Sequence, residues 1–300
     1  MSSVLYDAQG PGAKRRNILY TAAFLAVLAV VVWWVYSALD EKGQLAWVLW
    51  KPLFGSEAYT TYVWPGLQNT LKAAALAMVI ALPLGAALGI ARLSDHAWVR
   101  VPAAALVEFF RAIPVLVLMI FGNALYAMYT DVSSDDRPLY AVVTGLVLYN
   151  ASVLAEIVRA GILTLPKGQS EAAMAIGLRK GQVMRLILLP QAVTAMLPAI
   201  VSQLVVIVKD TALGGAVLTF PELLASASTM SAYYGANTLA SFTAVSVIFV
   251  LINFSLTSFA SRLEQWLRRS KKSTGAVLGA QDVATVVEKD AAAADTDVRN

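Results

Sequence analysis

The sequence predicts an all-α protein, a polytopic transmembrane helical bundle of about six spans, and three observations lead to this prediction. Hydrophobic residues make up 58% of the 300 residues and charged residues only 14%, whereas average soluble proteins carry about 25% charged residues. The charges are clustered, and the apolar runs between the clusters are long enough to cross a hydrocarbon core of about 30 Å. Lysines and arginines also concentrate in alternate connecting segments, as they do in multi-pass membrane proteins.

The first expected span covers about residues 18–39 and follows the basic cluster Lys14–Arg16. A signal peptide is the alternative for a basic flank before an apolar run. This run exceeds the roughly 7–15 residues of a signal core, and no small-residue cleavage site follows it cleanly. We therefore predict a transmembrane helix, anchored at the membrane interface by Trp33, Trp34 and Tyr36.

Five further spans are expected downstream. A polar, aromatic segment over 40–64 precedes them, and we expect Pro65–Gly66 to break it. The second span is expected to bend at Pro83. A polar, basic stretch over 156–185 separates the fourth span from the fifth, and a polar, aromatic loop begins at Lys209. The expected limits are 73–91, 112–129, 139–155, 186–208 and 239–260.

The distribution of basic residues predicts the orientation. Eighteen of the 23 lysines and arginines lie before the first span, after the second and fourth spans, or from Arg262 onward. Such an excess marks the cytoplasmic side. Six spans with both termini cytoplasmic satisfy this rule, and the net charge of +4 then reflects membrane orientation instead of nucleic-acid binding.

Several function classes are excluded by residues that the chain lacks. With no cysteine there is no disulfide framework, thiol nucleophile or thiolate metal site, and His96 has no second histidine with which to bind a metal. No G-x-x-x-x-G-K-[ST] phosphate-binding loop is present, and Lys180-Gly181 has the wrong order for one. We therefore expect no catalytic residues, no metal site and no cofactor bound by this chain.

The segment Gln169–Pro190 is the most informative part of the chain. Ser170 can cap a short helix that carries Glu171 in its first turn, where the helix dipole favours an anion. Ala172, Ala173 and Ala175 give that helix a slim surface suited to docking in another protein's groove. Gly177 is expected to end the helix, and an amphipathic piece over 183–188 then leads into the fifth span. On composition alone, a plain surface helix joining two spans is the favoured explanation of the segment.

The spacing within this segment resembles a known pattern. Glu171-Ala172-Ala173, then Gly177, then Ile187-Leu188-Leu189-Pro190 fill every fixed position of the EAA loop of bacterial binding-protein-dependent ABC importer permeases. Four other segments resemble the polar amino acid subfamily, the histidine, glutamine and glutamate type: Gly66–Leu71, Glu108–Pro114, Ala155–Ile162 with Lys167–Gln169, and Lys209–Leu213, where Ala212 replaces the usual serine.

The resemblance implies a type I ABC importer (MetI-like) permease fold and three regions. These are an N-terminal segment with an extra span (1–63), the permease transmembrane domain with its EAA loop at 171–190 (64–267), and a cytoplasmic tail expected to be disordered (268–300). It implies a bacterial plasma (inner) membrane location, an ABC ATPase dimer that binds ATP and Mg, a second permease subunit that is a sister chain or a copy, and an extracytoplasmic amino acid binding protein. The residues expected to couple to the ATPase are Glu171, Ala172, Ala173, Gly177, Ile187, Leu189 and Pro190.

Polar residues within or beside spans are candidates for contact with substrate. Asn150 and Gln203 can instead hydrogen-bond across helices, Glu156 and Arg159 can form a local ion pair, and Lys209-Asp210 can shape a gate. The candidates for the substrate pathway are Asn150, Gln203, Lys209, Asp210 and Thr211.

Subfamily similarity favours glutamate as the cargo. The alternatives are an ABC permease for another small solute such as methionine or an osmolyte, a carrier or channel without an ATPase, and a membrane-embedded enzyme. The EAA spacing argues against a stand-alone carrier, and the scattered carboxylates provide no reacting group of residues for an enzyme.

Overall fold

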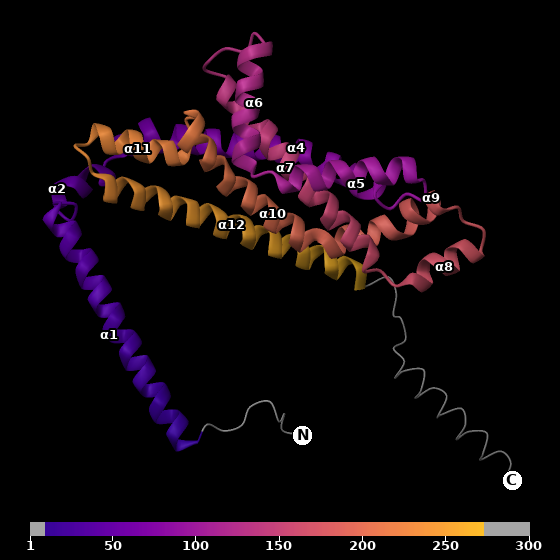
Figure 1. The fold of residues 1–300 in the computed structure, drawn as a ribbon, viewed down its shortest axis with the longest axis horizontal. Helices are drawn as coiled ribbons and strands as arrows, with labels where there is room; N and C mark the ends of the chain where they lie inside the picture. Colours follow the sequence, from indigo (N-terminus) through magenta and orange to yellow (C-terminus); the bar gives the residue numbers. More distant parts are fainter. Residues whose placement is uncertain (1–9, 273–300) are drawn as a thin grey trace. The chain divides into compact units, whose positions relative to one another are not determined.

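The computed structural model describes residues 10–272, and every regular element within that range is helical (Figure 1). The predicted tail lies almost entirely outside the described residues. Two compact units are present. The first contains the described residues up to Thr70 together with Gly215–Phe249, and the second contains Leu71–Gly214 and the described residues from Val250. The unit boundaries fall inside the long helices α4 (Trp64–Ala91), α10 (Leu189–Leu218) and α12 (Thr238–Lys272).

Five described helical segments are long and apolar enough to cross a membrane, and a sixth span arises if one bent pair is counted. The five are Gly12–Glu41, Ser56–Ala91, Arg137–Leu163, Lys180–Leu218 and Thr238–Arg262. The bent pair is α5 (Ala97–Ala112) and α6 (Val115–Tyr129), which meet at 99° around Ile113 and Pro114. The expectation of about six spans is confirmed, with the third as a broken helix pair.

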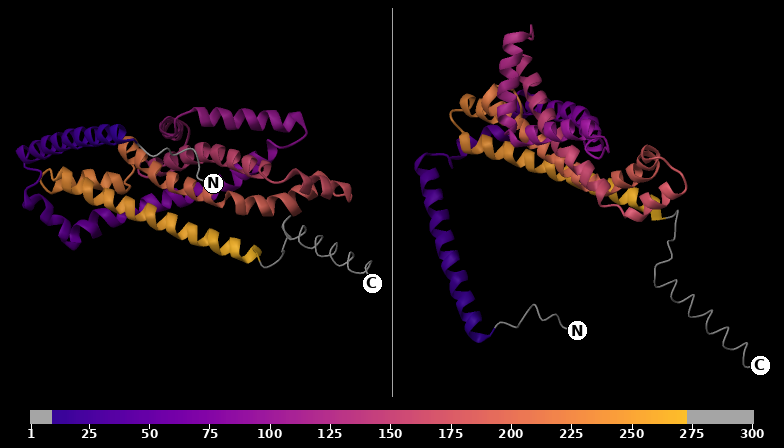
Figure 2. Two further views of the ribbon diagram at one scale, coloured as in Figure 1. Left: turned by 90° about the horizontal axis from the view of Figure 1, so that it is seen from below. Right: turned by 45° about the vertical axis from the view of Figure 1, so that its right-hand side comes forward.

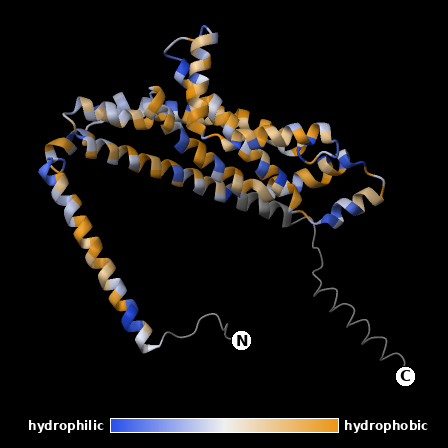
Figure 3. Cartoon of the chain, in the orientation of Figure 1, coloured by the Kyte–Doolittle hydropathy of each residue, from blue (hydrophilic) through white to orange (hydrophobic). Residues whose placement is uncertain are grey.

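The first unit begins with α1 (Pro11–Glu41), whose apolar length is exposed and contains no buried residue among those described. In Figure 3 the apolar colouring runs along most of this helix after a hydrophilic stretch near its start. Short elements follow: α2 (Trp47–Trp50), the 3-10 turn η1 (Lys51–Phe54), α3 (Ser56–Ala58) and the π-turn η2 (Tyr59–Val63). The unit also contains α11 (Leu223–Tyr233).

The expected break at Pro65–Gly66 is wrong, because both residues lie in the first turn of α4, which continues directly from η2. A proline has no N–H and crowds the carbonyl four residues earlier. The wider π-turn at Tyr59–Val63 places its extra residue just before Pro65 and thereby accommodates it. The same arrangement recurs where the π-turn η3 (Met184–Leu188) precedes Pro190.

The second unit is organised around α7 (Arg137–Leu163), against which α5 and α6 pack (Figure 2). Its core lies where α4, α7 and α10 meet, with Ala81, Leu154, Val158, Ala192 and Met196 among its buried members. A small residue occurs at every fourth position of α4, which lets its backbone approach that of a neighbouring helix. These residues are all buried: Ala73, Ala77, Ala81, Gly85 and Gly89.

Among the helices that extend beyond their predicted spans, two contain residues that were expected in connecting segments. α7 continues to Leu163, so Glu156 and Arg159 lie within a helix and not in the connecting stretch. α10 continues to Leu218, so Lys209, Asp210 and Thr211 also lie within a helix, and part of the loop expected after them is α11. Charged residues do not end a helix when they pair with one another or reach an exposed face.

Candidate functional site

The predicted EAA segment forms a helical hairpin in the second unit. It contains α8 (Lys167–Ala175), a turn, and α9 (Lys180–Val183), which continues through η3 into α10. The expected cap at Ser170 is wrong, because α8 already begins at Lys167 and Pro166 occupies the N-cap position. α8 therefore begins earlier than expected, so Ser170 lies within it and Glu171 lies beyond its first turn, contrary to the expectation for both residues.

Gly177 ends α8 as predicted. Its φ of +90° lies in the left-handed region, which glycine adopts without steric cost. The Gly177 N–H donates to the Met174 carbonyl at 3.0 Å, and the Leu178 N–H donates to the Ala173 carbonyl at 3.1 Å. These two bonds define a Schellman motif and fix the reversal of the chain between α8 and α9.

The hairpin buries one face and exposes the other. Ala173 and Val183 are buried, so Ala173 does not share the exposed surface of its neighbours on α8, and its expected role in docking stays a prediction. Glu171, Ala172 and Gly177 are exposed, as a docking surface requires.

Sequence reasoning missed two apolar residues at the hairpin tip. Ile176 has 81% of its surface exposed and Met174 has 47% exposed. Together they leave an exposed apolar surface at the end of α8. In the sequence, the feature that could have identified them is their position between the alanines and Gly177.

The residues at the start of the fifth span that are predicted to couple to the ATPase follow on from α9. Ile187 lies in η3, Leu189 and Pro190 begin α10, and the first two of these are partly buried. Leu189 packs on the cluster of Val158, Ala192 and Met196 in α7 and α10. The hairpin is therefore continuous with the core of the second unit.

Two Glu-x-x-Arg patterns lie beside this hairpin, and Arg92 joins their glutamates. Arg92 Nη1 is 2.7 Å from Glu156 Oε2 in α7, and Arg92 Nη2 is 3.0 Å from Glu108 Oε1 in α5. Arg159 Nη2 is 2.8 Å from Glu156 Oε1, which confirms the predicted local pair. Only 11% of the Arg92 side chain is exposed, so its guanidinium fork is held by the two carboxylates.

Among the substrate-pathway candidates, Asn150 and Gln203 are joined across α7 and α10 by a hydrogen bond from Gln203 Nε2 to Asn150 Oδ1. Asn150 Nδ2 also donates to the Leu146 carbonyl at 2.7 Å. Both side chains are buried, which is the structural alternative given for them above. Thr211 is buried and donates to the Val208 carbonyl at 2.7 Å, whereas Lys209 is exposed and Asp210 is half-buried.

Among the residues whose side chains the structure describes, up to Arg262, no group of three or more histidine, cysteine, aspartate or glutamate residues could hold a metal.

A family model described as "Binding-protein-dependent transport system inner membrane component" matches residues 81–269, which is more than half of the chain. The chain belongs to this family. The match includes the hairpin, both Glu-x-x-Arg patterns and α10. The prediction of an ABC importer permease fold is confirmed.

Two relatives and one solved structure indicate how close the similarity is. The "Glutamate transport system permease protein GluD" of Corynebacterium glutamicum is 47% identical over 78% of this chain and 85% of its own length. The "Glutamate/aspartate import permease protein GltK" of Escherichia coli is 36% identical over 69% of this chain and 92% of its own length. The "Crystal structure of an amino acid ABC transporter with histidines" contains a chain with 26% identity and a TM-score of 0.61, covering 69% of this chain and 94% of that one.

Proposed function

We propose that this chain is the membrane-spanning subunit of an ATP-driven importer, that it carries a polar amino acid, with glutamate favoured, and that it docks a separate ATPase through the α8–α9 hairpin. The observation that carries the proposal is the hairpin itself, within a chain of the binding-protein-dependent family. It offers an exposed carboxylate at Glu171 and exposed apolar groups at Met174 and Ile176.

The physical argument for coupling rests on how the hairpin is attached. Its reversal is fixed by the two Schellman bonds at Gly177, and its second helix continues through η3 into α10. A push on a hairpin that is internally fixed and continuous with a long helix moves the helix as a body. ATP and Mg would be bound by the partner ATPase dimer.

The choice of glutamate rests on the relatives named for it. GluD at 47% identity is a glutamate permease by name, and GltK at 36% identity is a glutamate and aspartate permease by name. Both are covered over more than four fifths of their length. The remaining partners in the proposal are a second permease subunit, a copy or a sister chain, and an extracytoplasmic binding protein, in an inner membrane with both termini of this chain cytoplasmic.

The test reconstitutes this chain into proteoliposomes with the ATPase and the binding protein encoded beside it. Labelled glutamate uptake is measured with and without enclosed ATP, with unlabelled aspartate, glutamine, histidine, arginine and methionine as competitors. We expect ATP-dependent glutamate uptake that Glu171→Lys abolishes, together with loss of co-purification of the ATPase. The matched control is Asp131→Lys, a charge reversal at an exposed residue outside the hairpin.

The outcomes separate the alternatives. Uptake that needs no ATPase and survives Glu171→Lys would overturn the importer proposal in favour of a stand-alone carrier. ATP-dependent uptake of another competitor, without glutamate, would keep the coupling and overturn the cargo.

A further inference from the structure

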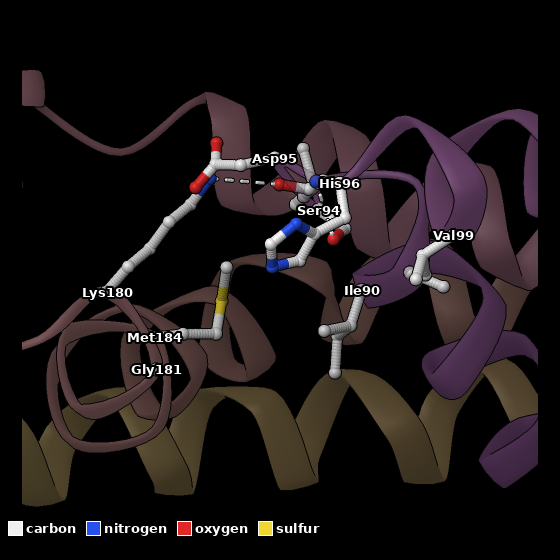
Figure 4. Close-up of a pocket in the computed structure, with 10 residues that line it drawn as sticks. Ile90, Ser94, Asp95, His96, Val99, Lys180, Gly181 and Met184 are labelled. Carbon is white, nitrogen blue, oxygen red and sulfur yellow. Dashed lines mark hydrogen bonds and ion pairs between the residues drawn. The ribbon is translucent and has the colours of Figure 1, made fainter.

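Lys180 connects the hairpin to a distant part of the same unit. It is the first residue of α9, and its ammonium group donates to the Leu93 carbonyl at 3.2 Å and forms an ion pair with Asp95. Leu93 and Asp95 belong to the link between α4 and α5, 87 and 85 residues away in sequence. Figure 4 shows the Lys180 side chain extended toward Asp95, with His96 and Ser94 beside it.

The same link is held from its other side by Arg92. That side chain bonds to Glu156 in α7 and to Glu108 in α5 at 2.7 and 3.0 Å. Four consecutive residues, Arg92 to Asp95, therefore join the end of α4 to α5, to α7 and to α9. Arg92 is largely buried and Lys180 is half-exposed. The ion pair of Lys180 is therefore the weaker attachment and breaks more readily than the bonds of Arg92.

The space between the link and α9 is open. A hollow of about 420 Å³ separates them, lined by Ile90, Ser94, His96, Val99, Gly181 and Met184. Lys180 reaches across one side of this hollow, so its ammonium connects the two surfaces that line it (Figure 4). A polar bridge across a hollow can open and close without the repacking that a filled core would require.

We propose that Lys180 is a positioning residue that transmits movement of the hairpin to the α4–α5 link. The hairpin then acts on the spans by two routes: through η3 into α10, and through Lys180 into residues 92–95. The inference rests on the proposed function, because it needs an ATPase that moves the hairpin.

The experiment measures the coupling ratio, amino acid transported per ATP hydrolysed, in the complete reconstituted importer. Lys180→Met removes the ammonium and keeps the side-chain length, and Asp95→Asn removes its acidic partner while leaving Lys180 in place. We expect each variant to lower the ratio about two- to five-fold, the factor typical of an exposed ion pair. Lys167→Met, a cation in the same hairpin but outside this bridge, is the matched control.

A double-mutant cycle distinguishes transmission from direct contact between Lys180 and the ATPase. If Lys180 acts through Asp95, the double variant is no worse than either single variant, because the same interaction is lost each time. The exchanged pair Lys180→Asp with Asp95→Lys should recover part of the ratio. A normal ratio in Asp95→Asn, with losses that add in the double variant, would overturn the proposal.

The chain has no cysteine, so a second measurement is possible without removing native thiols. Cysteines at positions 95 and 180 remove the ion pair and should lower the coupling ratio, and a reversible thiol cross-linker as long as the ion pair should raise the ratio again until the linker is cleaved. A ratio that stays as low with the two positions joined as with them apart would also overturn the proposal. ATP-dependent uptake by the unaltered importer tests the proposed function separately: its absence refutes that function and not only the role of Lys180.

Discussion

The Arg92 guanidinium donates through Nη1 to Glu156 Oε2 at 2.7 Å. This bond connects the α4–α5 link, which contains Arg92, to α7, which contains Glu156. Glu156 also accepts from Arg159, one turn later on α7, and Glu108 accepts from the other branch of Arg92. Two carboxylates this near would repel each other without the cation between them. The planar fork of arginine meets both at once, which a lysine ammonium does with less geometric precision.

Replacement of Arg92 is expected to lower the stability of the second unit. Arg92→Met leaves Glu108 and Glu156 facing each other without their shared donor, and we expect a loss of about 1–3 kcal/mol. Arg92→Lys should lose less, because the charge remains. The melting midpoint of the purified protein in detergent, followed by heating and size-exclusion chromatography, checks this order.

Arg111→Met is the matched control for Arg92. Arg111 lies 3.9 Å from Glu108, and the side chains of both residues are well exposed, so its loss should change the midpoint little. Equal midpoints for Arg92→Met and the unaltered protein would contradict the bridging role.

Within this chain, substitutions of Gly177 are expected to act through backbone strain and not through a clash. A Cβ at this position would meet nothing within 4 Å, but φ is +90°. Asparagine tolerates the left-handed region better than alanine does, and valine tolerates it least. We expect ATP-dependent uptake to fall in the order Asn, Ala, Val, while the valine variant still inserts and hydrolyses ATP, so that hydrolysis is uncoupled from transport.

The measurement for Gly177 is the coupling ratio in proteoliposomes, with membrane insertion confirmed by the amount of protein recovered. Gly181→Ala is the control, since a Cβ there also meets nothing within 4 Å and its φ is not positive. Normal coupling in Gly177→Val would show that the Schellman turn is not required.

Close packing of α4 on α7 predicts a large effect at Gly89. A Cβ there would lie 2.6 Å from the Ala155 carbonyl oxygen and 2.9 Å from Val158 Cβ. The backbone of α7 cannot move aside cheaply, so Gly89→Ala should destabilise the unit by about 1–3 kcal/mol. Gly122→Ala is the matched control, because its Cβ would meet Ala141 at an ordinary 3.7 Å. Indistinguishable melting midpoints for the two variants would contradict the close approach.

The ion pair at Asp95 predicts a dependence on pH. The hydrogen bond from Lys180 lowers the pKa of the Asp95 carboxyl below its ordinary value. A carboxyl with a lowered folded-state pKa contributes stability above its unfolded pKa of about 3.9 and loses it as the pH falls through the lower folded value. The midpoint difference between the unaltered protein and Asp95→Asn should therefore be constant from neutral pH to about 5 and disappear in stronger acid. A difference that disappears near neutral pH would contradict this assignment; added salt should also reduce it.

The sequence was sufficient for features that depend on local chemistry. Apolar length predicted the spans, and the Gly177 turn followed from residues next to it in the chain. The bridges at Arg92 and Lys180 could not be predicted, because each joins residues 16 to 87 positions apart through tertiary packing. The small-residue stripe of α4 was not predicted, although its four-residue spacing places these residues on one helix face. The break expected at Pro65 does not occur, because the π-turn before it accommodates the proline in a continuous helix.

The first unit contains a buried carboxylate, Glu222, and its contacts show that its role is structural. Glu222 has no exposed surface; its Oε2 accepts from the Leu224 N–H and its Oε1 from the Ala225 N–H, both at 2.7 Å, so it caps α11. Thr70 Oγ1, from α4, accepts from the Leu223 N–H at 3.0 Å. Three free N–H groups at the start of α11 are thereby satisfied by two side chains.

Glu222→Gln is expected to destabilise the unit by about 1–3 kcal/mol, because an amide offers one acceptor oxygen where two N–H groups need partners. Thr70→Val removes the third acceptor with nearly unchanged shape and should lower the melting midpoint, whereas Thr70→Ser should restore most of it. Thr229→Val is the control, since that hydroxyl is exposed and donates only to the Ala225 carbonyl of its own helix at 3.1 Å. If Glu222→Gln has the melting midpoint of the unaltered protein while Thr70→Val has a lower one, the carboxylate does not cap α11, and the threonine alone positions that helix.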